Sequence, residues 1–330
     1  MRRTLALTLL SLALPASAAA DAPAGSGGVP AGDPPAAPGE ATAPAGTGGT
    51  TFGDAPPRSA DERPARRRRT PRRTRTSGRP VLRGFALSTR RLYVYGAPAR
   101  VTFEIADRSD EVRVKLVVRR AGDRRVAAVI DLGDRRTGVA HRVSLDGFAG
   151  GDALPQGPLD LRLSARDPRG RTLRSGARAS VSQQLELYWH RFPLRGAFTY
   201  GGEGSRFGAG RPGRSHQGQD LTAPEGTPVV APRGGVVQTV AYQAEGAGHY
   251  VILDGAGEDR DYAFMHLQTG SIPVRVGQRV RTGQLLGRVG NTGASSGAHL
   301  HFEIWEGRGW YEGGSPVDPL PYLRRWDSWS

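Results

Sequence analysis

The stretch 299–304, His-Leu-His-Phe-Glu-Ile, constrains the fold of this chain more than any other segment. Read as a β-strand, its side chains point alternately to the two faces of a sheet. His299, His301 and Glu303 then share one face, and the three apolar residues share the other. The apolar face can pack on a core while the polar face lines a cleft. Two imidazoles on one face can lie close to one metal ion, although structural histidines also occur in an H-x-H pattern.

Two upstream segments add further candidate ligands. Segment 215–220 contains His216 and Asp220, four positions apart, and the apolar segment 262–267 contains His266. Zinc binds imidazole nitrogen and carboxylate oxygen, and a catalytic zinc site combines three protein ligands with one open position. The chain has no cysteine, which excludes a thiolate zinc site. The residue types therefore indicate a hydrolytic metal site rather than a structural one.

The order of these motifs resembles the M23 family of zinc metallopeptidases, the lysostaphin- and LytM-like enzymes that cut peptide bonds in bacterial peptidoglycan. The resemblance covers residues 192–323 and rests on H-x-x-x-D, then a tyrosine-containing strand that ends in His-Leu, then H-L-H-F-E. It implies an antiparallel β domain with a groove closed at its ends by loops. It also implies that Zn²⁺ is the cofactor, ligated by His216, Asp220 and His301, and that His266 and His299 are the catalytic imidazoles.

The chemistry of such a site follows from its residue types. Zinc polarises a carbonyl and lowers the pKa of bound water toward about 7. The chain has no H-E-x-x-H glutamate to act as a base, so a neutral His266 or His299 must take the proton from that water. Imidazole suits this role because its pKa of about 6.5 lies near the working pH. The other imidazole would stabilise the oxyanion, and the spacing does not assign the two roles.

Two hypotheses of different classes remain open. The first is a zinc metalloendopeptidase that hydrolyses peptidoglycan stem peptides or cross-bridges. The second is a non-catalytic M23-like module that binds the wall and activates another wall hydrolase. Degenerate members of the family lose zinc ligands or catalytic histidines, whereas all five positions are filled here, which favours the enzyme. A nucleic-acid binder would rest on the arginine content alone, and we expect no such partner.

The N-terminus predicts export. Residues 1–20 carry two arginines, an apolar run at 5–14 and a small-residue cleavage site at 16–18, as a secretory signal peptide does. The run is too short to span a bilayer core of about 30 Å, and we expect no transmembrane helix in the mature chain. An uncleaved N-terminal anchor is the alternative. The expected location is extracytoplasmic, in the cell wall or periplasm, or secreted.

Residues 21–80 read as a disordered linker. Its first part, 21–57, is rich in Ala, Gly, Pro and Thr and has no apolar periodicity, so it cannot bury enough surface to fold. Its second part, 58–80, carries ten arginines and two acidic residues, about half of the chain's net charge of +15. Two interpretations stay open: Arg58–Pro80 is a loose tether to anionic wall polymers or the envelope surface, or it is a solvated linker without a partner.

The remaining chain divides into two mainly β domains. Residues 81–182 show short alternating runs separated by turn signals, which predicts an immunoglobulin-like β-sandwich. The expected strands there include 101–105, 112–118, 126–132, 139–145, 159–163 and 172–181. Residues 183–330 form the predicted M23-like peptidase domain, with strands at 229–240, 250–253, 262–267, 284–289 and 299–305 and no sustained helical periodicity. Trp310 and Tyr311 could form a groove wall, but we favour ordinary packing for both.

Overall fold

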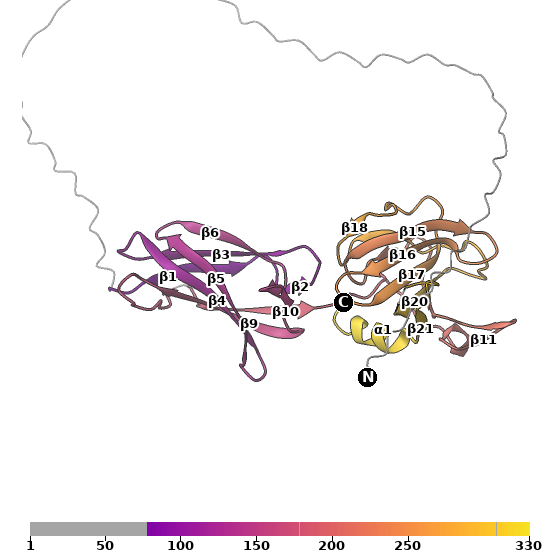
Figure 1. The fold of residues 1–330 in the computed structure, drawn as a ribbon, viewed down its shortest axis with the longest axis horizontal. Coiled ribbons are helices and arrows are strands. Elements are labelled where there is room, and N and C mark those ends of the chain that lie inside the picture. The colour runs from indigo at the N-terminus through magenta and orange to yellow at the C-terminus, as the bar shows by residue number, and fades with distance from the viewer. Residues whose placement is uncertain (1–77, 178, 308) are drawn as a thin grey trace, which may run out of the picture. The chain divides into compact units, whose positions relative to one another are not determined.

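The computed structural model describes residues 78–177, 179–307 and 309–330, and this part of the chain is mainly β (Figure 1). The predicted fold class is therefore confirmed. The predicted signal peptide, 1–20, and nearly all of the predicted linker, 21–80, lie outside the described residues. Within the described ranges no helix has both the length and the apolar character needed to cross a membrane.

The first β region consists of two sheets that share one core. The three-stranded sheet has the order β1 (Val81–Leu87), β3 (Ala99–Ala106), β6 (Ala140–Leu145). The five-stranded sheet has the order β2 (Arg91–Tyr93), β10 (Ser182–Tyr188), β9 (Gly157–Arg166), β4 (Glu111–Arg120), β5 (Val126–Arg136), and β7 (Phe148–Ala149) pairs with β8 (Asp152–Ala153). Alternate residues of β3 and β4 are buried, and one apolar cluster joins both sheets. The alternation thus builds a two-sheet core, while the immunoglobulin-like topology stays a prediction.

The predicted last strand of this region, 172–181, is wrong. The described residues of this segment make only isolated bridges, and the strand that completes the sheet is β10, which pairs with β9 and β2. Leu185 and Leu187 alternate with polar residues and are buried in the core. The sequence-based prediction placed these residues in the following domain, 183–330, and included no strand here. The five-stranded sheet therefore continues past the predicted boundary at residue 182.

The C-terminal region is built on a seven-stranded sheet. Six strands have the order β13 (Gln219–Thr222), β20 (His299–Glu306), β17 (Arg260–Leu267), β16 (Gly248–Gly255), β15 (Gly235–Gln243), β18 (Arg279–Val280), and β21 (Ser315–Val317) pairs with the end of β20. All of these pairings are antiparallel, as predicted. Smaller elements are η1 (Glu203–Ser205), the hairpin of β11 (Gly210–Arg211) and β12 (Arg214–Ser215), and the pair β14 (Pro228–Val230) and β19 (Leu285–Arg288).

Two predictions for this region are wrong in detail. The predicted single strand 229–240 is two strands, β14 and β15, which lie in different sheets. Pro232 lies between them, and proline cannot donate a hydrogen bond to a central ladder. The described residues also include an α-helix that the sequence did not predict, α1 (Leu320–Asp327), whose Leu323 and Trp326 join the apolar core of the sheet. Its eight residues are too few for a sustained helical period.

The alternation predicted for 299–304 is confirmed in β20. Leu300, Phe302 and Ile304 are fully buried in the apolar core, on the side that α1 covers. His299, His301 and Glu303 line a groove on the opposite side. The central strand thus anchors the core with one set of side chains and presents the polar set to the groove.

Candidate metal centre

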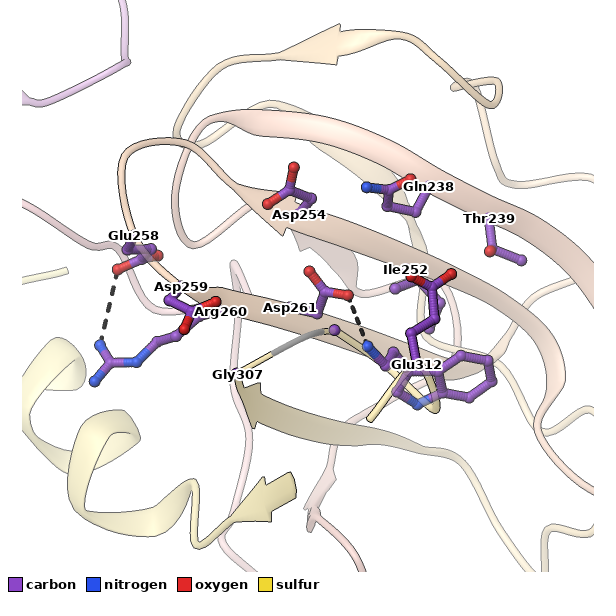
Figure 2. A pocket seen from close by; sticks show the side chains of 12 residues that line it. Gln238, Thr239, Ile252, Asp254, Glu258, Asp259, Arg260, Asp261, Gly307 and Glu312 are labelled. Carbon is purple, nitrogen blue, oxygen red and sulfur yellow. Dashed lines mark hydrogen bonds and ion pairs between the residues drawn. The ribbon is translucent and has the colours of Figure 1, made fainter. Parts of the chain in front are cut away.

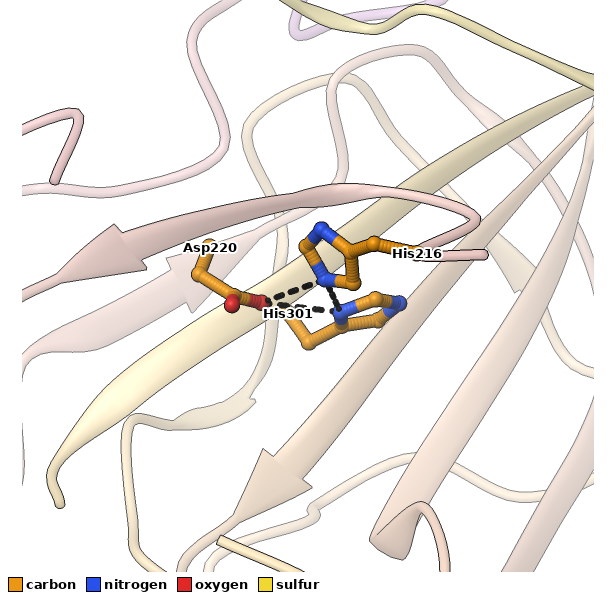
Figure 3. Close-up of side chains that lie close together, drawn as sticks. All are labelled: His216, Asp220 and His301. Atoms are coloured by element: carbon orange, nitrogen blue, oxygen red, sulfur yellow. Dashed lines mark hydrogen bonds and ion pairs between the residues drawn. The ribbon is translucent and has the colours of Figure 1, made fainter. Parts of the chain in front are cut away.

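Three side chains from two neighbouring segments meet at the groove floor. Asp220 in β13 lies directly opposite His301 in β20, and His216 follows β12 immediately upstream. His216 Nε2 lies 3.0 Å from Asp220 Oδ1, His301 Nδ1 lies 2.9 Å from the same oxygen, and the two nitrogens are 2.9 Å apart (Figure 3). Among the described residues these three form a group whose ligand atoms could hold one metal ion. They are the three residues that the family resemblance implied as zinc ligands.

In all three side chains, the polar atom that points away from the candidate metal site forms a hydrogen bond with another residue. His216 Nδ1 donates to the carbonyl of Arg206 at 2.8 Å, which leaves Nε2 facing the site. His301 Nε2 lies 2.9 Å from Oε1 of Glu303, and Arg211 donates to Asp220 Oδ2 at 3.2 Å. Such outer contacts orient metal ligands and select the tautomer that binds. Two imidazole nitrogens and one carboxylate oxygen, all facing one point, fit zinc-type ligation.

The approach of β13 to β20 depends on Gly218. A Cβ atom at this position would lie 2.5 Å from the carbonyl oxygen of Phe302 and 2.8 Å from His301 Nε2. Any side chain here would therefore push the two ligand-bearing strands apart. Glycine at position 218 is required by this close contact.

Hydrogen bonds within the site shift the pKa values of two candidate ligands, Asp220 and His301, in opposite directions. Burial alone would raise the pKa of Asp220, but hydrogen bonds from His216 and His301 hold it well below its usual range. Burial alone would lower the pKa of His301, but hydrogen bonds to Asp220 and Glu303 outweigh it and raise the value to about 9. A metal ion has to displace the His301 proton, so metal binding weakens as pH falls.

His266 reaches the groove through a β-bulge. Strict alternation along β17 would place it on the core side with Tyr262 and Phe264, which are fully buried. Instead the register with β16 shifts, so that Met265 and His266 lie opposite the single residue Tyr250. His266 adopts φ of 61°, a left-handed conformation that is rare for a residue with a side chain. Bulges of this kind re-aim side chains next to functional sites.

Both predicted catalytic imidazoles present Nε2 as their free ring nitrogen. His266 Nδ1 donates to the carbonyl of Thr292 at 2.8 Å, and His299 Nδ1 donates to the carbonyl of Gly297 at 2.7 Å. The two ring centroids are 4.7 Å apart, and His299 Nε2 lies 3.6 Å from Asp220 Oδ1. Burial lowers the pKa of His266 to about 4, so this imidazole is neutral near pH 7. The structure thus brings all five predicted residues to one groove.

Three further residues at the groove were missed or misread from the sequence. Arg211 and Glu303 each contact a candidate ligand, although neither was given a role. For Trp310 packing was favoured over a place in the groove wall, but it lines the groove together with Tyr311, so the less favoured alternative applies. The alternation His299, His301, Glu303 was the available signal for Glu303, whereas Arg211 reaches Asp220 only because the β11–β12 hairpin folds back.

A second depression lies on the neighbouring part of the same sheet and is strongly acidic (Figure 2). Its lining includes Asp254, Asp259, Asp261 and Glu312, and Trp310 borders both hollows. None of the five candidate site residues lines it. Asp261 accepts a hydrogen bond from the backbone N–H of Trp310 at 2.8 Å, which fixes the loop between the two hollows.

Part of this chain is similar to known peptidases. Residues 214–319 match the model of Peptidase family M23. An uncharacterized metalloprotease of Haemophilus influenzae is 41% identical over 107 residues, which are 32% of this chain and 21% of that protein. The peptidoglycan DD-endopeptidase ShyC of Vibrio cholerae is 37% identical over 91 residues, 28% of this chain and 20% of that protein. The chain spans about a fifth of the length of each of these two relatives.

Among solved structures, the catalytic domain of lysostaphin from Staphylococcus simulans is similar. It is 30% identical with a TM-score of 0.33, and the match covers 39% of this chain and 92% of that domain. The predicted resemblance is confirmed, and residues 214–319 form a Peptidase M23 domain. The family and the metalloprotease name imply a metal ion, and the His-Asp-His group is a candidate site for it.

Proposed function

We propose that the M23 domain of this chain is a zinc endopeptidase that cuts peptide bonds in peptidoglycan outside the cytoplasm. One observation carries the proposal: His216, Asp220 and His301 offer ligand atoms within 3.0 Å of one another, and His266 and His299 flank them in one open groove. The peptidoglycan endopeptidase among the relatives supports the substrate class. The signal-like residues 1–20 support export.

In the proposed mechanism His216, Asp220 and His301 hold the metal. Bound zinc supplies a Lewis acid and lowers the pKa of water toward about 7. His266 is neutral and carries its lone pair on Nε2, because Nδ1 donates to Thr292, so it suits proton abstraction. Because His299 Nδ1 already donates to the carbonyl of Gly297, only the imidazolium form of His299 would also donate through Nε2, toward the developing oxyanion. Both rings are fixed by backbone carbonyls and need no reorganisation during the reaction.

The groove lets an extended peptide reach these residues. Arg211 and Arg214 lie along it near the metal ligands, and Tyr242, Glu245 and Tyr311 line other parts. The test is to incubate the purified protein with sacculi of direct and of bridged cross-link types and to identify the released fragments by mass spectrometry. New amino termini that appear only with metal would support the endopeptidase. Binding to sacculi without any new terminus, by metal-loaded protein, would instead indicate a non-catalytic module.

The pH dependence tests the role of His266. Its pKa is lowered to about 4 from an ordinary 6.5, so its neutral form persists to lower pH than that of an exposed imidazole. In protein kept saturated with zinc, kcat/KM should therefore hold below pH 6.5 and fall only as pH approaches the lowered value. Activity and bound zinc should be followed together, because protonation of ligands also releases metal. An acid limb at or above 6.5 with zinc still bound would contradict His266 as the base.

Arg58–Pro80 is proposed to tether the enzyme to anionic wall polymers. Deleting residues 60–80 should leave cleavage of a small soluble peptide unchanged and weaken binding to intact anionic walls. The loss should be largest at low salt, because charge attraction is screened beyond about 10 Å at 0.1 M ionic strength. Wall sedimentation across a salt series measures it. Equal binding with and without the segment at every salt concentration would contradict the tether.

A further inference from the structure

Glu303 is a buried carboxylate beside the candidate metal centre. Its residue is 3% exposed, and it stands on the same face of β20 as His299 and His301. Burying a charged carboxylate is costly unless hydrogen bonds compensate for the lost water. An apolar residue would fill this position at lower cost to folding. The charge therefore calls for an explanation other than packing.

Three donors surround this carboxylate. Oε1 lies 2.9 Å from His301 Nε2, and Oε2 lies 2.7 Å from the indole nitrogen of Trp305 and 3.0 Å from that of Trp310. An indole N–H can only donate, so Oε2 accepts two hydrogen bonds and cannot carry a proton there. The two tryptophans thus exclude a proton from Oε2 and fix its direction, so any proton shared by Glu303 and His301 lies between Oε1 and Nε2.

The contact with Glu303 determines which ring nitrogen of His301 carries the proton. Imidazole is a stronger base than a carboxylate, with ordinary pKa values of about 6.5 and about 4.3, so the single proton between these two residues belongs to His301 Nε2. With Nε2 protonated, the lone pair of the neutral ring is on Nδ1, the atom that faces His216 and Asp220. Glu303 therefore selects the tautomer and the ring orientation that a metal ion needs.

One of the two clamping indoles comes from a loop and not from the sheet. Trp305 lies within β20 and is buried, whereas Trp310 belongs to the connection between β20 and β21. The backbone of that loop is closed by a hydrogen bond from Gly314 N to Gly309 O of 3.2 Å, and Trp310 N donates to Asp261. The loop thus holds its indole against Glu303 from outside the strand.

We propose that Glu303, clamped by Trp305 and Trp310, is a positioning residue for the metal centre, and that the loop 309–314 tunes metal affinity through the Trp310 indole. This inference rests on the proposed function only in requiring that His301 binds a metal. It assigns no contact between Glu303 and substrate.

The test compares metal affinity in four full-length proteins. Glu303→Gln removes the charge at nearly constant volume, and Trp310→Phe removes one N–H donor but keeps an aromatic ring. Glu312→Gln is the matched control, because Glu312 is an exposed acid of the same loop that lines the other hollow. The zinc dissociation constant is measured by chelator competition, and thermal unfolding is measured on the metal-free proteins. In zinc-loaded protein, NMR of the imidazole nitrogens reports whether His301 keeps a protected Nε2–H.

The expected result is a loss of zinc affinity of about 10–100-fold for Glu303→Gln, which is the usual scale for an outer partner of a ligating histidine. Trp310→Phe should lose less in the same direction, and Glu312→Gln should match the wild type. The protected Nε2–H should disappear only in Glu303→Gln. Unchanged affinity in Glu303→Gln, or a lower melting temperature of the metal-free protein without an affinity loss, would overturn the inference. Zinc binding by a wild type that cleaves no sacculus would sink the proposed function alone.

Discussion

Replacing His301 with alanine is expected to abolish both metal binding and peptidase activity. The variant keeps only His216 and Asp220 as candidate ligands, and a catalytic zinc site uses three. It also leaves Glu303 without its imidazole partner in a buried position. We expect zinc affinity to fall by more than the about 100-fold that marks the loss of an outer partner. Metal analysis after gel filtration, paired with hydrolysis of a cross-linked muropeptide, measures both effects.

The matched control is His249→Ala. His249 lies on β16 of the same sheet, packs on Tyr242 and does not belong to the His-Asp-His group. This variant should keep its zinc and its activity. A His301→Ala protein that is folded and still binds one zinc per chain with wild-type affinity would contradict the ligand assignment.

Replacing His299 with alanine should have a different result, although the two histidines are two positions apart on one strand. His299 Nδ1 is held by the carbonyl of Gly297, and the residue does not join the three-ligand group. The variant should therefore retain close to one zinc per chain. Turnover should fall by about 10²–10⁴-fold, which is the range for a positioned acid–base group. Metal content and peptide hydrolysis measured on the same preparation separate the two outcomes.

Zinc loss in His299→Ala comparable to that in His301→Ala would make His299 a ligand instead. His299 Nε2 lies 3.6 Å from Asp220 Oδ1, so His299 is close to the candidate metal centre whether or not it is a ligand. Proximity therefore does not decide its role, and the comparison of the two variants does. Circular dichroism of both variants serves as the control for folding.

The sequence allowed the site to be predicted largely because β20 alternates without interruption. Its apolar and polar positions separate by simple period-two counting, and that places His299 and His301 together. The same counting fails for His266, which alternation along β17 assigns to the core face. A bulge, not the local residue pattern, turns it into the groove. His266 was a candidate from its residue type and segment, but its catalytic role came only from the motif resemblance, because pairing register depends on the neighbouring strand.

The other features that the sequence did not predict correctly have related physical causes. The indole of Trp310 donates to Glu303 from a loop, and the path of that loop depends on a hydrogen bond to Asp261 in another strand. No local sequence pattern therefore encodes the contact. The strand predicted at 172–181 does not form among the described residues of that segment. A segment with alternating apolar residues becomes a strand only where a neighbouring strand has free backbone hydrogen-bonding groups. There β9 pairs mainly with β4 and β10. Pairing is a property of the assembled sheet, which a single segment does not contain.

The pairing of β13 with β20 has a consequence for the order of events during folding. Asp220 and His301 are 81 positions apart in the chain, so their meeting requires closure of a long loop. Contacts of such separation are costly to form early. A nascent or unfolded polypeptide consequently has two dispersed ligand segments and no assembled centre. Catalytic competence should arise late, with completion of the sheet. A metal that binds only the native state then adds stability that increases with its concentration above Kd.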